Sequence, residues 1–175
     1  MKLLVHLGRL WRAALIMLSV IAVSTLFGCA QYPRVPTKFD VQSSTDRWQG
    51  RIAVVVESSP KQAFSAYFDL QGDSKNGQME LSTALGTILA RMQWSTQEAL
   101  LQTGTNTRAY PSLRELTFAA LGADLPFEAL LQWLRGVPAS DDGWQSDLSE
   151  FESGKVNARR LLPEPRVDLK IILDR

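Results

Sequence analysis

The sequence predicts a mainly β protein with a small helical lid, preceded by a segment for export. Three observations lead to this prediction: short apolar segments between turn-forming residues from Arg47 onward, two helical patterns between Pro111 and Gly136, and an N-terminus that is first basic and then apolar. Short segments with alternating apolar residues are typical of antiparallel strands, whereas apolar residues three and four apart indicate helices. A sheet and helices that each have one apolar face are expected to cover each other.

The N-terminal segment has the order of features found in a secretory signal peptide. Its basic residues precede an apolar stretch from Ala13 to Phe27, which ends at Gly28-Cys29. This stretch has 15 residues, fewer than the roughly 20 that a membrane-spanning helix needs. We therefore expect residues 1–28 to be removed as a signal peptide.

Cys29 is the expected site of lipid attachment. Leu26-Phe27-Gly28-Cys29 resembles the bacterial lipobox, in which the Cys is acylated and becomes the first residue of the mature protein. Cys29 is also the single Cys of the chain, so it has no disulfide partner. The alternative is a free Cys at the end of an ordinary cleaved signal or of an uncleaved membrane helix. Ala30 follows where an Asp would mark inner-membrane retention, so the resemblance implies the outer membrane of a Gram-negative bacterium, on its periplasmic face.

The composition of the remaining 147 residues fits one domain and excludes several function classes. Three of the 19 basic residues lie in the signal, which leaves 16 against 18 acidic residues and a net charge of −2. A nucleic-acid partner would require a clustered basic excess. The single His, His6, is also in the signal. Catalysis by Ser-His-Asp or Cys-His and metal sites of His and Cys are therefore excluded, and we expect neither a cofactor nor an enzyme.

The expected elements follow in chain order. Residues 29–46 contain two prolines and no apolar period, which predicts a flexible tether before a domain at 47–175. Alternation is clearest from Gln62 to Gln71 and from Arg166 to Asp174, where each strand has one apolar face. Between them, the capping box Ser112–Glu115 begins one helix, and a second runs from Pro126 to Gly136. Strands resume at Trp144.

These landmarks resemble the LolB family, lipoproteins that receive other lipoproteins from a soluble periplasmic carrier and insert them into the outer membrane. The segments that carry the resemblance are Gly50–Val54, Phe64–Gln71, Leu85–Thr87, Gln132–Pro138, Gly143–Gln145 and Arg166–Ile171. The resemblance implies a half-open antiparallel β-barrel, covered by short helices, that encloses an apolar cavity for acyl chains. Its implied partners are a LolA-like carrier, cargo lipoproteins and outer-membrane lipid, with the protein itself a monomer. Because five residues separate Pro138 from Trp144, fewer than in many relatives, a more open barrel is expected here.

A cavity for acyl chains needs inward-facing aliphatic and aromatic side chains rather than a nucleophile. Methionine suits such a lining because its flexible thioether adapts to irregular ligands. The alternative for each candidate is an ordinary packed core, and periodicity does not separate the two. The candidate lining residues are Ile52, Val54, Phe64, Phe68, Met79, Leu81, Ile88, Met92, Leu130, Trp133 and Leu134.

Leu85 is the candidate residue for membrane insertion. It lies in the turn-like run Ser82–Gly86, between two apolar segments, and a large apolar residue at a loop tip is unusual. By position it matches the exposed Leu that LolB-like proteins press into the bilayer during delivery. The alternative is that Leu85 folds back and caps one end of the barrel.

Two rival functions remain on the sequence alone. One is a structural envelope lipoprotein with a filled barrel that binds a protein partner. The other is a hydrolase with paired carboxylates, for which the candidates are Asp141, Asp142 and Asp147; their turn-rich surroundings favour solvated loop residues. Arg108, Arg159 and Arg160 are expected to be surface charges.

Overall fold

The computed structural model describes residues 46–174, which lie within one compact unit, Lys38–Arg175. The predicted signal peptide, Cys29 and nearly all of the predicted tether lie outside the described residues. Within the described part of the chain, no helix has the length and apolar character required to span a bilayer.

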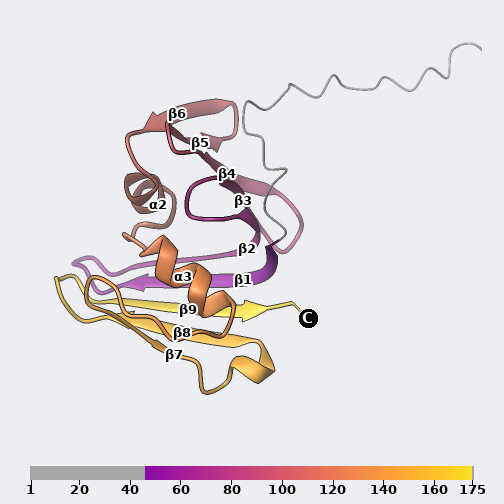
Figure 1. The fold of residues 1–175 in the computed structure, drawn as a ribbon. Coiled ribbons are helices and arrows are strands. Elements are labelled where there is room, and N and C mark those ends of the chain that lie inside the picture. The colour runs from indigo at the N-terminus through magenta and orange to yellow at the C-terminus, as the bar shows by residue number, and fades with distance from the viewer. Residues whose placement is uncertain (1–45, 175) are drawn as a thin grey trace, which may run out of the picture. The chain divides into compact units, whose positions relative to one another are not determined.

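Nine strands form one antiparallel sheet in the order β6-β5-β4-β3-β2-β1-β9-β8-β7 (Figure 1). Neighbouring strands are consecutive in the chain except for β1, which pairs with β9, the last strand of the chain. The strands are β1 (Arg47–Val56), β2 (Gln62–Gly72), β3 (Gly77–Ser82), β4 (Ile88–Trp94), β5 (Ala99–Thr103), β6 (Asn106–Tyr110), β7 (Trp144–Asp147), β8 (Lys155–Arg160) and β9 (Val167–Leu173).

The sheet has one buried and one solvent-exposed face, as the alternating pattern predicted. On β2, Ala66, Phe68 and Leu70 are buried, whereas Ser65 and Tyr67 are exposed. The same alternation runs across β1 and β9, which pair residue for residue with Ile52 opposite Ile171. Because cross-strand partners share a face, the register brings the apolar residues of all three strands into one layer.

Two helices lie against the buried face of the sheet, which curves around them (Figure 1). Helix α2 (Leu113–Leu121) begins as predicted, with the Ser112 hydroxyl accepting a hydrogen bond from the backbone N–H of Glu115 at 3.2 Å. Helix α3 (Phe127–Leu134) follows Pro126 and ends before Gly136, whose positive φ of 77° reverses the chain. A short 3-10 helix, Phe151–Ser153, precedes β8.

The sheet is open, because its order ends at β6 and β7 and these two strands are not paired with each other. The chain between them forms α2, α3 and a short connection, Val137–Gly143, which contains no strand of its own. The mainly β class and the helical lid are confirmed, and the half-open barrel takes the form of an open, curved sheet.

Gly143 occupies a position that tolerates no side chain, which yields a prediction about stability. Its φ is +81°, and a Cβ atom there would lie 1.9 Å from the carbonyl oxygen of Leu162. We expect Gly143→Ala to lower the free energy of unfolding by about 2 kcal/mol or more, from backbone strain and the clash together. Gly86 is a matched control, because its φ is +79° but nothing lies within 4 Å. Urea unfolding should show a smaller decrease in the free energy of unfolding for Gly86→Ala than for Gly143→Ala. Equal decreases would contradict the predicted clash at Gly143.

Candidate functional site

The apolar interior between the sheet and the helices contains most of the predicted lining residues. Nine of the eleven are at most 5% exposed, and they belong to one cluster of buried apolar side chains. Six come from strands β1 to β4 and three from α3. They are Ile52, Val54, Phe68, Met79, Leu81, Met92, Leu130, Trp133 and Leu134.

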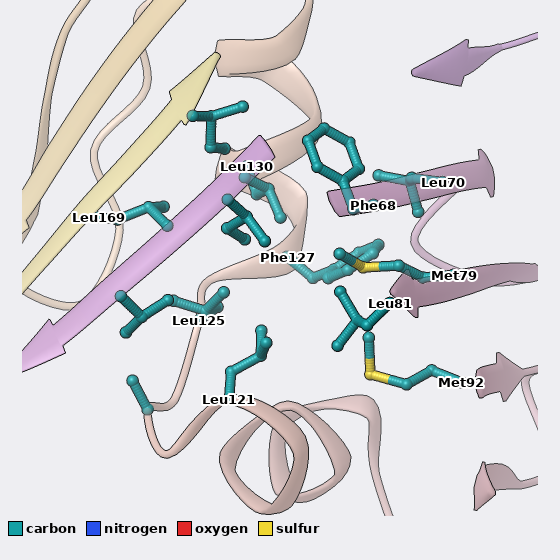
Figure 2. Close-up of a cluster of buried hydrophobic side chains, with 14 of the residues drawn as sticks. Phe68, Leu70, Met79, Leu81, Met92, Leu121, Leu125, Phe127, Leu130 and Leu169 are labelled. Carbon is teal, nitrogen blue, oxygen red and sulfur yellow. The ribbon is translucent and has the colours of Figure 1, made fainter. Parts of the chain in front are cut away.

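Figure 2 shows side chains of the sheet pointing toward side chains of the helical segment. Met79 and Met92 are cross-strand partners on β3 and β4, and they face the region of Leu121 and Phe127 (Figure 2). Phe127 also packs edge-on against Trp94, with ring centroids 4.9 Å apart. The interior is therefore filled by the protein's own side chains, which include the flexible thioethers of Met79 and Met92 (Figure 2).

The end of helix α3 is attached to the β7 end of the sheet by two tryptophans. Trp133 is fully buried, and its indole N–H donates a hydrogen bond of 2.9 Å to the carbonyl oxygen of Ala139. Its ring lies 6.1 Å from the ring of Trp144, the first residue of β7. These contacts hold the end of the lid close to the edge strand β7.

Phe64 and Ile88 differ from the other predicted lining residues. Phe64 is half-buried near the start of β2 and packs against the rim of the core. Ile88 is 39% exposed, because a register shift after Leu81 pairs Ser82 with Ile88 instead of Leu89. One inserted residue moves the following side chains to the opposite face of a sheet. Ile88 therefore lies away from the interior.

Leu85 lies at the tip of the loop between β3 and β4 and is 94% exposed. Three hydrogen bonds of Thr83 hold the loop. The Thr83 carbonyl accepts a hydrogen bond of 2.9 Å from the Gly86 N–H, and the Thr83 N–H donates one of 2.9 Å to the Thr87 carbonyl. The Thr83 hydroxyl accepts a third, of 3.2 Å, from the Thr87 N–H. A turn fixed in this way presents Leu85 outward, so Leu85 does not cap the end of the sheet.

The chain segment around Leu85 is uncharged and partly apolar. No Asp, Glu, Lys or Arg occurs from Ser82 to Ala90, and Ile88 and Leu89 are 39% and 38% exposed beside the loop. A contiguous exposed apolar patch is unusual for a soluble surface and marks a membrane or protein contact. The Leu85 tip is defined as the exposed residues Leu85, Ile88 and Leu89, which place three exposed apolar side chains within residues 85–89.

An opening of about 340 Å³ leads toward the interior between the starts of α2 and α3 and the connection to β7. Its apolar lining includes Leu125, Phe127 and Trp144, which are core residues. Arg114 spans the opening: its guanidinium bonds Asp142 at 2.9 Å and also forms an ion pair with Asp124. The hydrogen bond that Arg114 donates to Asp142 and the negative charge of Asp124 raise the pKa of Arg114.

Two of the three carboxylates considered for a hydrolase are engaged in hydrogen bonds with other residues. Asp142 is engaged by Arg114, and the exposed Asp147 accepts a hydrogen bond from the Ser149 N–H at 3.0 Å. That hydrogen bond lowers the pKa of Asp147, whereas a general acid of a glycosidase requires a raised one. Among residues 46–174, no group of three or more His, Cys, Asp and Glu side chains could hold a metal ion.

The arginine pattern was predicted incorrectly at one position. Arg159 and Arg108 are exposed, but Arg160 is 7% exposed on the buried face of β8. Its guanidinium carbon lies 5.9 Å from the ring centre of Trp144, and it donates a hydrogen bond of 3.3 Å to the Pro165 carbonyl. Pro165 is five positions after Arg160 and Trp144 is on the neighbouring strand β7. The alternation of β8, in which Val156 and Ala158 are also buried, was the sequence signal for the burial of Arg160.

Comparisons with known proteins identify the family of this chain. The family model described as outer membrane lipoprotein LolB matches residues 46–160. An outer-membrane lipoprotein LolB of Bordetella petrii is 25% identical, over 83% of this chain and 85% of the relative. The LolB protein of Shewanella loihica is 26% identical over 71% of this chain, which spans 58% of that relative's length. The LolB protein of Vibrio atlanticus is 28% identical over 75% of this chain, which spans 62% of that relative's length. The chain therefore belongs to the LolB family, the non-enzymatic outer-membrane lipoproteins that receive other lipoproteins and insert them into the outer membrane.

Proposed function

We propose that this chain takes lipoproteins from a LolA-like periplasmic carrier, holds their acyl chains between the sheet and helices α2 and α3, and releases them into the outer membrane at the Leu85 tip. The observation that carries the proposal is the combination of a continuous apolar interior with an exposed, uncharged apolar tip on one domain. The interior would shield acyl chains from water, and the tip would contact the bilayer.

The acyl chains of the cargo determine how much free energy of burial the receptor must provide. Each buried methylene contributes about 0.8 kcal/mol, so a receptor must offer an apolar surface of comparable extent. Because the interior is filled in the structure, acyl chains enter when the helices move away from the sheet. Met79 and Met92 can then repack against chains of irregular shape, since their side chains have several rotatable bonds.

The opening beside Arg114 is the proposed point of entry. Its lining reaches the core at Leu125 and Phe127. The ion pairs of Arg114 with Asp124 and Asp142 connect α2 to the α2–α3 loop and to the connection before β7. Exposed ion pairs contribute little stability, so this closure can break and re-form as the helices move.

Entry of an acyl chain predicts a change in tryptophan fluorescence. Trp94, Trp133 and Trp144 are at most 2% exposed in the interior, so a brominated long-chain fatty acid that reaches them should quench their emission. The measurement uses residues 30–175, which contain the whole compact unit, titrated with brominated and unbrominated fatty acid. Binding without quenching would place the ligand outside the interior and would support the filled structural lipoprotein instead.

A substitution on the buried face tests the same proposal. Phe68→Asp places a carboxylate among apolar side chains without a partner, which is strongly unfavourable, and should abolish uptake from a loaded carrier. Ala63→Asp is the matched control, because Ala63 is exposed on the same strand. Circular dichroism shows whether each variant folds. A folded Phe68→Asp variant that accepts cargo like the parent would contradict the proposed lining. If the variant does not fold, the quenching experiment on the parent chain tests the proposal instead.

A further inference from the structure

The exposed face of the sheet carries a second apolar groove, beside the Leu85 tip. It has a volume of about 490 Å³, within the range of small-ligand sites. Its floor is formed by Tyr67 of β2, Ala53 of β1 and Ile172 of β9, and residues Ser82–Ala84 form one wall. Tyr67 and Ile172 are each 39% exposed. Since Ala84 precedes Leu85 directly, the groove is continuous with the loop that bears the tip.

Two cations flank this apolar floor. Arg51 pairs across the sheet with Tyr67 and Ile172, and Lys170 pairs with Ala53. Arg51 and Lys170 are therefore diagonal neighbours on β1 and β9, with backbones roughly 7–8 Å apart. Among residues 46–174, neither forms an ion pair, and no carboxylate lines the groove.

The acidic residues of the three strands are already engaged. Asp69 of β2 is held by Arg47, with one hydrogen bond of 2.9 Å, and this hydrogen bonding lowers the pKa of Asp69. Asp168 of β9 accepts a hydrogen bond of 2.6 Å from Arg159. Two neighbouring cations without a counter-charge repel each other, and an anion placed between them relieves that repulsion.

We propose that this groove binds the anionic headgroup of a membrane phospholipid, with Arg51 and Lys170 on the phosphate and the first part of an acyl chain along Tyr67, Ala53 and Ile172. The proposal rests on the proposed function, because it adds an orienting contact to the insertion of Leu85. When Leu85 enters the bilayer, the adjoining groove lies at the level of the headgroups. The guanidinium carbon of Arg51 lies 6.0 Å from the ring centre of Tyr67, so this cation already contacts the apolar floor. Two cations without an ion pair beside an apolar floor match a phospholipid better than they match a free phosphate ion.

The test measures binding of residues 30–175 to vesicles of phosphatidylcholine alone and of phosphatidylcholine mixed with phosphatidylglycerol. We expect Arg51→Gln and Lys170→Gln each to weaken binding to the anionic vesicles about fivefold, with no change on neutral vesicles. Arg108→Gln is the matched control, because Arg108 is an exposed arginine on the edge strand β6, away from the groove, and its loss changes the net charge equally. The control should bind like the parent.

Three outcomes would overturn the proposal. Groove variants that bind anionic vesicles like the parent would show that the cations do not contact lipid. An equal loss in Arg108→Gln would show a response to net charge alone. Normal vesicle binding combined with lost uptake from the carrier would indicate a protein-docking surface. Failure of the proposed function is distinguishable, because it would appear as a lack of transfer of labelled lipoprotein from the carrier to the parent chain, measured separately from headgroup binding.

Discussion

Leu85→Glu is expected to abolish delivery of lipoproteins to a membrane while leaving their uptake intact. Leu85 is 94% exposed, so its replacement should change the free energy of unfolding by no more than about 0.5 kcal/mol. Burial of one Leu side chain in a bilayer is worth about 1.5–3 kcal/mol, and a carboxylate at the same position opposes insertion. The step from receptor to membrane should therefore fail, whereas the step from carrier to receptor proceeds.

The measurement separates these two steps. Labelled lipoprotein is first passed from the carrier to the variant in solution, and the loaded variant is then mixed with vesicles. Leu85→Phe should remain active because it keeps an apolar tip, and Leu162→Glu is a matched control at another Leu, 69% exposed, away from the loop. Normal delivery by Leu85→Glu would refute insertion by Leu85. Loss of stability and uptake together would instead place Leu85 in the core.

Cys29→Ser is expected to abolish lipid attachment and membrane fractionation of the chain. Cys29 lies outside the described residues, so this prediction depends on the sequence around it. Because the diacylglyceryl group is transferred to a thiol, a Ser variant should remain an unlipidated precursor. Metabolic labelling with a fatty acid measures the attachment, and separation of the two membranes measures the location.

Ala30→Asp provides the matched control for Cys29→Ser. It changes the neighbouring residue without removing the thiol, so the variant should keep the lipid label but remain in the inner membrane. Label retained by Cys29→Ser, or absent from the parent chain, would show that Cys29 is not the attachment site.

The strands and helices were predictable because their signals are local. The alternation of β2 and the capping box of α2 depend on residues close together in the sequence, and both elements appear where expected. The burial of Phe68, Met79 and Met92 follows from the same period. The sequence patterns also indicated that the helices cover the apolar face of the sheet, since no other element offers them an apolar partner.

Other features depend on contacts between distant segments and were not predictable. The register shift that turns Ile88 outward arises from the pairing of β3 with β4. The ion pairs of Arg114 join residues 10 and 28 positions away. The groove beside Arg51 requires β1, β2 and β9 to be neighbours, which alternation within each strand does not reveal.

The central claim is that this chain passes lipoproteins from a carrier to a bilayer. Its most direct test mixes a carrier loaded with labelled lipoprotein with vesicles, in the presence and absence of residues 30–175, and follows the label. We expect the label to reach the vesicles when the chain is present and to stay on the carrier when it is absent. Label that remains on the carrier in both samples, or reaches the vesicles equally in both, would contradict the claim.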